Sequence, residues 1–266
     1  MRWFNSILAT FQFELINFLS LQRLAVTAIL ALFPPVMLSL IFVGFRFTNG
    51  NFQFPLIVTV LFVSIVCLLG MLLWATPNIY SELEGKSWIF VASRPGGRIS
   101  IILGKYLSAV IFGFAICVVA ITGCLVVIQW MTGALKNPIW VWFSMNLLYL
   151  IGCLSYGAIY SLIGTMFYRR AMVVAAAYTI VSSIVLANVP AVISRLTLRY
   201  HLQFIGFNWF GEEMGIDIKD LLNHYSLTDV PSSFYHLLWL GTAILCALSA
   251  AAWVVRSREY ITSDET

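Results

Sequence analysis

The sequence predicts an all-α integral membrane protein whose single transmembrane domain, residues 1–266, crosses the bilayer six times. Composition is the first observation: 61% of the residues are hydrophobic and 10% are charged, with a mean hydropathy of +0.93. Soluble domains are about 45–50% apolar and about 25% charged. The second observation is that the apolar residues form six runs, each long enough to cross about 30 Å of hydrocarbon.

The first predicted element is an amphipathic helix over residues 2–20. Its apolar residues recur at alternating spacings of four and three, at Phe4, Leu8, Phe11, Leu15 and Phe18. This pattern is typical of a helix lying in the membrane interface. Phe13 and Ile16 blur it, so the alternative is an extended start to the first span. The segment lacks a cleavage-site pattern, and we expect the first span to stay in place as an anchor.

Six predicted spans follow, over residues 24–45, 54–75, 106–131, 139–167, 171–189 and 237–255. Pro34 and Pro35 are expected to kink the first span. Arg169 and Arg170 turn the chain from the fourth span into the fifth. None of the six ranges contains Asp, Glu, Lys, Arg or His, which argues against a carrier that relays protons or ions through intramembrane charges.

The distribution of basic residues predicts the orientation. Of the 15 lysines and arginines, ten fall on the side of the amino terminus and five on the other side. Cytoplasmic loops carry the excess of such residues, so both termini are predicted to be cytoplasmic. Residues 76–105 then form a cytoplasmic loop and residues 191–235 an outer segment. The net charge of +4 is explained by orientation, so nucleic acid is not predicted as a partner.

Short helices that cap the outer ends of the spans are predicted within residues 191–235, ahead of the last span. Four aromatic residues there suit the headgroup zone: Phe204, Phe207, Trp209 and Phe210. Three histidines lie in or beside this segment: His201, His224 and His236. A metal site built from them with Glu212, Glu213 or Asp217 is the alternative to a structural role. Because their spacing matches no standard ligand pattern, no metal is predicted.

The five cysteines all lie inside apolar runs: Cys67, Cys117, Cys124, Cys153 and Cys246. No two of them form the close CxxC pair of a zinc or redox site. They are expected to be core residues.

The loop at residues 76–105 carries the densest charge in the first 190 residues. Glu82 and Glu84 suit the positive end of a short helix, and Gly85 permits close backbone approach. Trp88 and Phe90 belong to an apolar turn that could fill a groove on a soluble partner. The alternative is an interfacial helix with snorkelling charges and no partner.

The loop motifs resemble those of ABC-2 type transporter permeases. They are Ser81-Glu82-Leu83-Glu84-Gly85, Trp88-Ile89-Phe90-Val91, Ser93-Arg94-Pro95 with Arg98, and Ile102-Leu103-Gly104-Lys105-Tyr106-Leu107. The resemblance implies an amino-terminal elbow helix at residues 2–20 and a cytoplasmic coupling helix between the second and third spans. Lys86 and the pair Gly96-Gly97 depart from the family pattern and bear on the subfamily. The implied contacts with an ATPase partner are Glu82, Leu83, Glu84, Gly85, Lys86, Trp88, Ile89, Phe90 and Arg94.

In that family, ATP and Mg²⁺ bind a separate cytoplasmic ABC ATPase subunit. The present chain has no phosphate-binding loop, so we expect it to bind no cofactor and not to be an enzyme itself. The resemblance further implies pairing with a second copy or a homologous permease in the lipids of the bacterial cytoplasmic (inner) membrane. It places the route along the second and fifth spans, where the chain offers Thr59, Ser64, Thr179, Ser182, Ser183 and Asn188.

An apolar route with scattered hydroxyl groups suits export of an amphipathic or lipid-like substrate. The fourth span is the most polar, and its side chains either line the route or bond helices together: Asn146, Tyr149, Ser155, Tyr156, Tyr160 and Ser161. Two other functions stay open, a membrane assembly or scaffold factor that docks a cytoplasmic partner and a passive channel.

Overall fold

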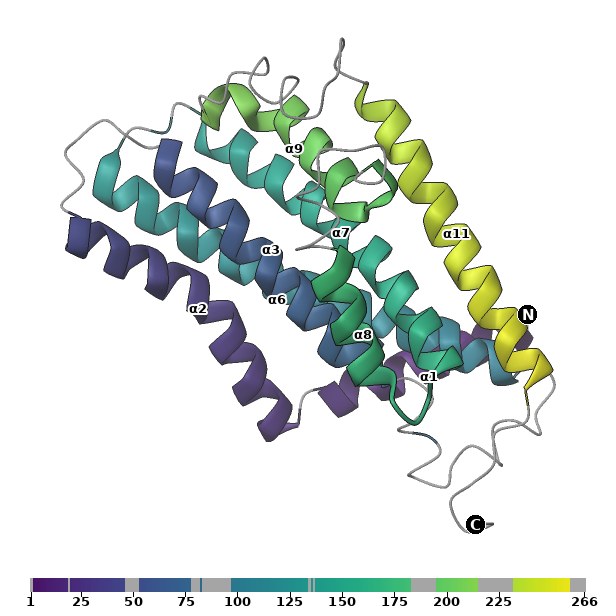
Figure 1. Ribbon diagram of the computed structural model, residues 1–266. Coiled ribbons are helices and arrows are strands. Elements are labelled where there is room, and N and C mark those ends of the chain that lie inside the picture. Colours follow the sequence, from purple (N-terminus) through teal and green to yellow (C-terminus); the bar gives the residue numbers. More distant parts are fainter. Residues whose placement is uncertain are drawn as a thin grey trace.

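The computed structural model describes residues 2–18, 20–45, 53–77, 82, 97–133, 135, 137–182, 195–214 and 232–258. Throughout these residues the regular elements are helices, and they contain no strand (Figure 1). The helices are α1 (Arg2–Phe18), α2 (Leu21–Phe45), α3 (Gln53–Ala75), α6 (Gly97–Thr132), α7 (Pro138–Met166), α8 (Ala171–Ile180), α9 (Leu198–Met214) and α11 (Ser233–Ser257).

Five of the described helices are long and apolar enough to cross a membrane: α2, α3, α6, α7 and α11. The prediction of an all-helical protein is confirmed, and these five helices are consistent with a multi-pass membrane protein. Helix α8 occupies the start of the predicted fifth span, is ten residues long and continues as a wider turn through residue 182. Residues 183–189 of that predicted span lie outside the described residues.

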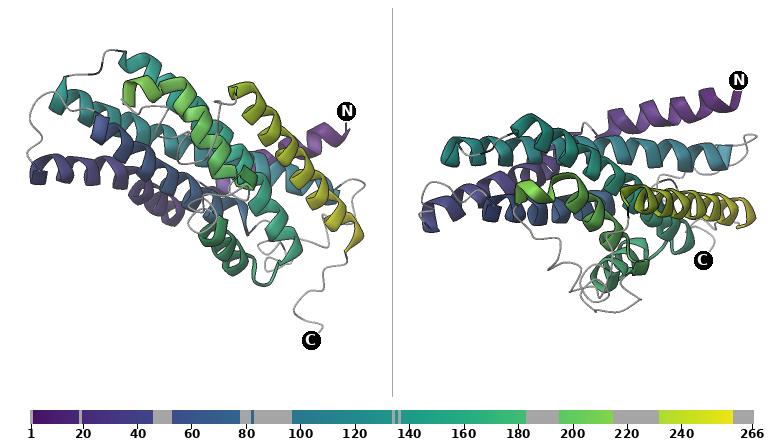
Figure 2. Two further views of the ribbon diagram at one scale, coloured as in Figure 1. Left: turned by 45° about the horizontal axis from the view of Figure 1, so that its top comes forward. Right: turned by 90° about the horizontal axis from the view of Figure 1, so that it is seen from above.

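Helices α6 and α7 form the centre of the bundle. Helix α6 packs against α1, α2, α3 and α7, while α7 also contacts α8, α9 and α11 (Figures 1 and 2). The main core contains large side chains that are fully buried between these helices, among them Met71, Ile121, Met145 and Tyr160. Two small helices, α8 and α9, lie against α3 and α7.

Helix α6 begins nine residues before the predicted third span, because Gly97–Lys105 is helical rather than part of the loop. Helix–helix contacts explain this difference. Gly104 lies so close to α1 that a Cβ atom there would be 2.8 Å from the Cβ of Thr10. On another side Ile101 and Ile102 pack against Ala251 and Val255 of α11. The charged residues of Gly97–Lys105 predicted a loop. Packing against α1 and α11 stabilises this segment as a helix.

Two other helices also extend past their predicted spans. Helix α2 begins at Leu21 and includes Arg23, and α11 begins at Ser233 and includes His236. With Lys105 in α6, ionisable residues therefore do lie within the helices, although near their ends. The predicted absence of ionisable residues holds for the six spans as drawn from the sequence, but not for the longer helices of the structure.

Helices α1 and α2 are separate, since α1 ends at Phe18 and α2 begins at Leu21. The structure thus describes residues 2–18 as a helix of their own, and the location of this helix in the membrane interface stays a prediction. Helix α1 runs parallel to the first half of α6, with Ser6 Oγ 3.1 Å from Ser100 Oγ and the Phe18 ring stacked 4.9 Å from that of Phe112. Figure 2 shows α1 beside this end of α6 in both views.

Helix α2 contains Pro34 and Pro35 in its interior and changes direction along its length in Figure 1. The Pro35 ring faces α6, where a Cβ on Gly123 would come within 3.0 Å of its Cγ. A missing hydrogen bond and the steric bulk of proline explain a bend at this place.

Helix α9 lies within the segment predicted to hold short helices. Its aromatic residues are only partly where the sequence placed them, because Phe204 and Phe210 are buried among neighbouring helices. Rings that stack on other rings inside the protein are not available to the headgroup zone. The Phe204 ring, for example, stacks on His236. The neighbouring His201 stacks on Trp239 in the same way.

Candidate functional site

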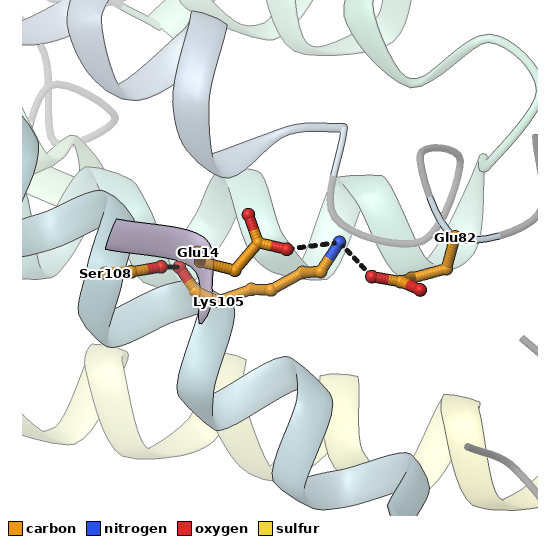
Figure 3. A network of polar contacts seen from close by, with 4 residues as sticks. All are labelled: Glu14, Glu82, Lys105 and Ser108. Atoms are coloured by element: carbon orange, nitrogen blue, oxygen red, sulfur yellow. Dashed lines mark hydrogen bonds and ion pairs between the residues drawn. The ribbon is translucent and has the colours of Figure 1, made fainter. Parts of the chain in front are cut away.

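A buried lysine connects three distant parts of the chain. Lys105 of α6 places its Nζ 3.1 Å from Oε1 of Glu14 in α1 and 2.7 Å from Oε1 of Glu82 in the loop (Figure 3). The side chains are 5%, 11% and 15% exposed, respectively. The Ser108 hydroxyl donates to the Lys105 carbonyl one turn further along α6. One ammonium group thus bridges two carboxylates at the start of a long helix.

A second cation lies beside this charge network. Arg23 stands over the rings of Phe18 and Trp74, at 5.5 and 5.7 Å from their centroids. With Glu14 and Lys105 these residues line a small cavity of about 80 Å³. Charges that are partly removed from water are stable only when paired with opposite charges or hydrogen-bonded, so the network couples α1, α6 and the loop segment at Glu82.

Of the predicted ATPase-contact residues, Glu82 lies in the described part of the chain. The remaining ones lie outside the described residues: Leu83, Glu84, Gly85, Lys86, Trp88, Ile89, Phe90 and Arg94. Their role stays a prediction.

A larger cavity of about 400 Å³ lies between α3, α7, α8 and α9. Its lining is mainly aliphatic, from residues such as Leu61, Leu68 and Leu202. Its polar lining residues are Ser64, Tyr149, Tyr156, Thr179, Arg199 and Gln203. Arg199 and Gln203 are four residues apart and therefore lie on one side of α9. An apolar cavity with a few polar groups and one cation is suited to an amphipathic molecule.

The predicted route residues are only partly gathered at this cavity. Ser64 and Thr179 line it. Thr59 is fully buried, and its hydroxyl donates to the Pro55 carbonyl at 2.9 Å. Ser182 is also buried, at 8% exposure. Ser183 and Asn188 lie outside the described residues.

Two tyrosines of α7, Tyr149 and Tyr160, bond it to neighbouring helices, and Tyr149 also lines the cavity. The Tyr149 hydroxyl lies 2.7 Å from the Val60 carbonyl of α3, to which it donates, and 3.1 Å from the Ser64 hydroxyl. Tyr160 and Thr179 join α7 to α8 through hydroxyl groups 2.6 Å apart. Tyr149 is at the same time a lining residue. Tyr149 thus bonds α7 to α3 and also borders the cavity, while its role in lining a translocation route stays a prediction.

Two of the three histidines meet inside the protein. The Nδ1 atoms of His201 and His236 are 2.7 Å apart, and Nε2 of His201 lies 2.9 Å from the Arg195 carbonyl. His201 must donate from Nε2 to that carbonyl, so its Nδ1 accepts a hydrogen bond from His236. Burial, and after it the nearby His236, lower the pKa of His201 to about 4. Both nitrogens of His201 are engaged, which favours a structural role over metal ligation. His224 and Asp217 lie outside the described residues.

Sequence reasoning missed the roles of Glu14 and of three cysteines. Glu14 is a charged residue within the predicted amphipathic helix at residues 2–20, and the structure buries it against Lys105. Cys67, Cys117 and Cys153 come together from α3, α6 and α7, with their sulfur atoms all within 4.8 Å of one another. Their separation along the chain hides this arrangement, and only helix packing creates it.

In a comparison with known proteins, neither the protein-family models nor the curated proteins contained a match to this chain.

Proposed function

We propose that this chain is the membrane-spanning permease subunit of an ABC-2 type exporter, driven by a separate cytoplasmic ATPase subunit that binds ATP and Mg²⁺. In this proposal α1 is the elbow helix, and residues 82–91 form the coupling helix. The fifth of six spans comprises α8 and the residues after it. Two such subunits pair in the bacterial cytoplasmic membrane, with both termini in the cytoplasm.

The observation that carries the proposal is the salt bridge between Lys105 and Glu82. A loop that receives force from a partner must be attached to the helices that it moves. Glu82 lies at the start of the proposed coupling helix, and its carboxylate is 2.7 Å from the ammonium group of α6. Through Glu14 the same ammonium group holds α1. Movement of the loop would therefore act directly on α6 and α1.

The cavity of about 400 Å³ supports a substrate that is amphipathic or lipid-like. It is lined by aliphatic side chains of α3 and α7, with hydroxyl groups at Ser64 and Thr179 and a cation at Arg199. A small ion that prefers oxygen ligands would find few of them there, whereas an acyl chain with an anionic end would match both kinds of surface.

The deciding experiment is copurification of the tagged full chain from its host in mild detergent, with identification of its partners and an ATPase assay. We expect a soluble ATPase in roughly equal amount. Trp88→Asp combined with Phe90→Asp should abolish this association by removing the apolar contact, while the variant still inserts into the membrane. Trp88→Phe combined with Phe90→Leu is the matched control, since it keeps an apolar surface and should keep the partner.

Unchanged copurification by the double aspartate variant would place the partner contact elsewhere. A chain that purifies without any ATPase would refute the proposal and leave the passive channel to be tested by conductance in planar bilayers. A stable non-ATPase partner would instead identify an assembly or scaffold factor.

A further inference from the structure

Three thiol groups converge in the middle of the bundle. Cys67, Cys117 and Cys153 are 3%, 0% and 0% exposed. The Sγ atoms of Cys67 and Cys153 are 3.6 Å apart, and all three sulfur atoms lie within 4.8 Å of one another. A metal ion bonded to three sulfurs at about 2.3 Å in a plane separates them by about 4.0 Å. An ion could therefore enter this cluster with little movement of the helices.

A fourth sulfur lies beside the three thiols. Met71 is one helical turn after Cys67 on α3 and is fully buried. A Cβ atom at Gly113 would lie 2.7 Å from the Met71 Sδ and 3.9 Å from the Cys153 Sγ, so both sulfurs border the same small space. The absence of a side chain at Gly113 lets the Met71 thioether occupy that space. A second glycine, Gly152, faces the Cys67 Sγ, which would lie 3.6 Å from its Cβ.

The cluster also has a route of access. Cys67 and Gly152 form part of the wall of the 400 Å³ cavity between α3, α7, α8 and α9. A small ion that reaches the cavity would meet the Cys67 sulfur directly. The other two thiols lie just behind it in the core.

The type of donor atoms identifies the kind of ion. The cluster offers three cysteine thiols, and the Met71 thioether borders it. Structural Zn²⁺ sites use four ligands from cysteine, histidine and carboxylates. Soft thiolate and thioether ligands instead favour Cu⁺.

We propose that Cys67, Cys117 and Cys153, assisted by Met71, form a binding site for a soft monovalent cation, Cu⁺. Each cysteine sulfur bonds the ion as a thiolate, so binding through all three releases three thiol protons to solvent as one Cu⁺ enters. The loaded site carries two more negative charges than the empty one, and the three metal–sulfur bonds offset the cost of placing them in the low-dielectric interior. The step changes no oxidation state. This site does not depend on the transporter proposal.

The test is Cu⁺ titration of the purified full chain in detergent, under nitrogen, against a coloured Cu⁺ chelator. Copper bound after gel filtration is then measured, and X-ray absorption reports its ligands. We expect one Cu⁺ per chain with a coordination shell made of sulfur only. Cys67→Ala, Cys117→Ala and Cys153→Ala should each weaken binding at least tenfold, and Met71→Leu, which preserves volume, should weaken it by a smaller factor.

Two other cysteines provide matched controls. Cys124 is buried and Cys246 is exposed, and neither belongs to the cluster. Cys124→Ala and Cys246→Ala should bind Cu⁺ as the unaltered chain does. If one of the alanine variants of the cluster elutes as an aggregate, Cu⁺ binding by Cys153→Ser is measured in its place.

The proposal is overturned if the folded unaltered chain binds no Cu⁺, or if binding survives removal of all three cluster cysteines. Equal weakening by Cys124→Ala would also overturn it. Tighter binding of Zn²⁺ than of Cu⁺ would refute the choice of ion. A disulfide between Cys67 and Cys153 in protein isolated from native membranes would show that the thiols serve another purpose.

Discussion

At the scale of single residues, buried polar groups are the features that the chain can least easily lose. Lys105 is 5% exposed and lies between two carboxylates. The cost of placing such a lysine in a helical bundle is offset only while its partners remain. His201 presents the opposite case, because burial keeps it neutral.

Lys105→Met should destabilise the protein strongly. Removing the ammonium group takes away the cation that Glu14 and Glu82 share, and breaking a buried pair costs about 3–5 kcal/mol. Thermal unfolding in detergent, followed by size exclusion, measures the loss. The triple change Glu14→Gln, Glu82→Gln and Lys105→Met removes all three charges and should recover part of it. A single variant as stable as the unaltered chain would show that the pairs contribute nothing.

His201 should make stability depend on pH in mildly acidic solution. Its pKa is lowered from the ordinary 6.5 to about 4, chiefly by burial. Between these values the unfolded chain binds more protons than the folded chain, so stability falls as the pH drops from about 6.5 to about 4. The His201→Gln variant should show a smaller loss over the same window. Melting temperatures of both proteins from about pH 7.5 to about pH 4.5 test this, and identical slopes would exclude His201 as the cause.

At the scale of helices, close packing depends on positions without a side chain. Gly104 lets α1 approach α6, and Gly123 accommodates the Pro35 ring. The tightest approach is at Gly164 of α7, where a Cβ would collide with the Thr76 carbonyl just after α3. Small residues at such crossings are typical of helix packing in membranes.

Gly164→Ala should therefore destabilise the contact between α3 and α7. The added methyl group meets backbone, which cannot rotate away, so the two helices must separate. Gly241→Ala in α11 is the matched control, because no atom lies within 4 Å of its Cβ position. Alanine is favoured over glycine in helices by about 1 kcal/mol, so the control should be neutral or slightly stabilised. Equal melting temperatures of the two variants would contradict the close approach of Gly164 to the Thr76 carbonyl.

At the scale of the whole molecule, the number of crossings decides on which side the chain ends. Five described helices could span a membrane, and α8 is ten residues long. With five crossings the termini lie on opposite sides, and with six they share a side. Basic residues are in excess beside the amino terminus and within residues 76–105. This excess favours a cytoplasmic location for both termini.

Reporter proteins fused to each end of the full chain should both report a cytoplasmic location. Green fluorescent protein is active inside the cell and alkaline phosphatase is active outside it, so the two reporters cross-check each other. Phosphatase activity at the carboxyl terminus, with fluorescence at the amino terminus, would mean that residues 171–189 do not cross.

The sequence alone determined the helical class and the approximate positions of the five long apolar helices. Their hydrophobic runs need no tertiary contact to be recognised, because lipid requires each spanning segment to satisfy its own backbone hydrogen bonds. The bend at Pro34 and Pro35 follows from a local pattern too, whereas the sequence left open whether residues 2–20 extend the first span. Glu82 and Lys105 both stand out in the sequence as charged residues of the loop, but nothing in the sequence predicts that they pair.

Only the tertiary structure decided which distant residues meet. Glu14 lies beside Lys105, His201 beside His236, and Cys67 beside Cys153, each pair joining different helices. Composition and periodicity describe one helix at a time, whereas these contacts depend on the rotation and crossing of two or three helices. The early start of α6 has the same cause, since α1 and α11 supply the packing that makes Gly97–Lys105 helical.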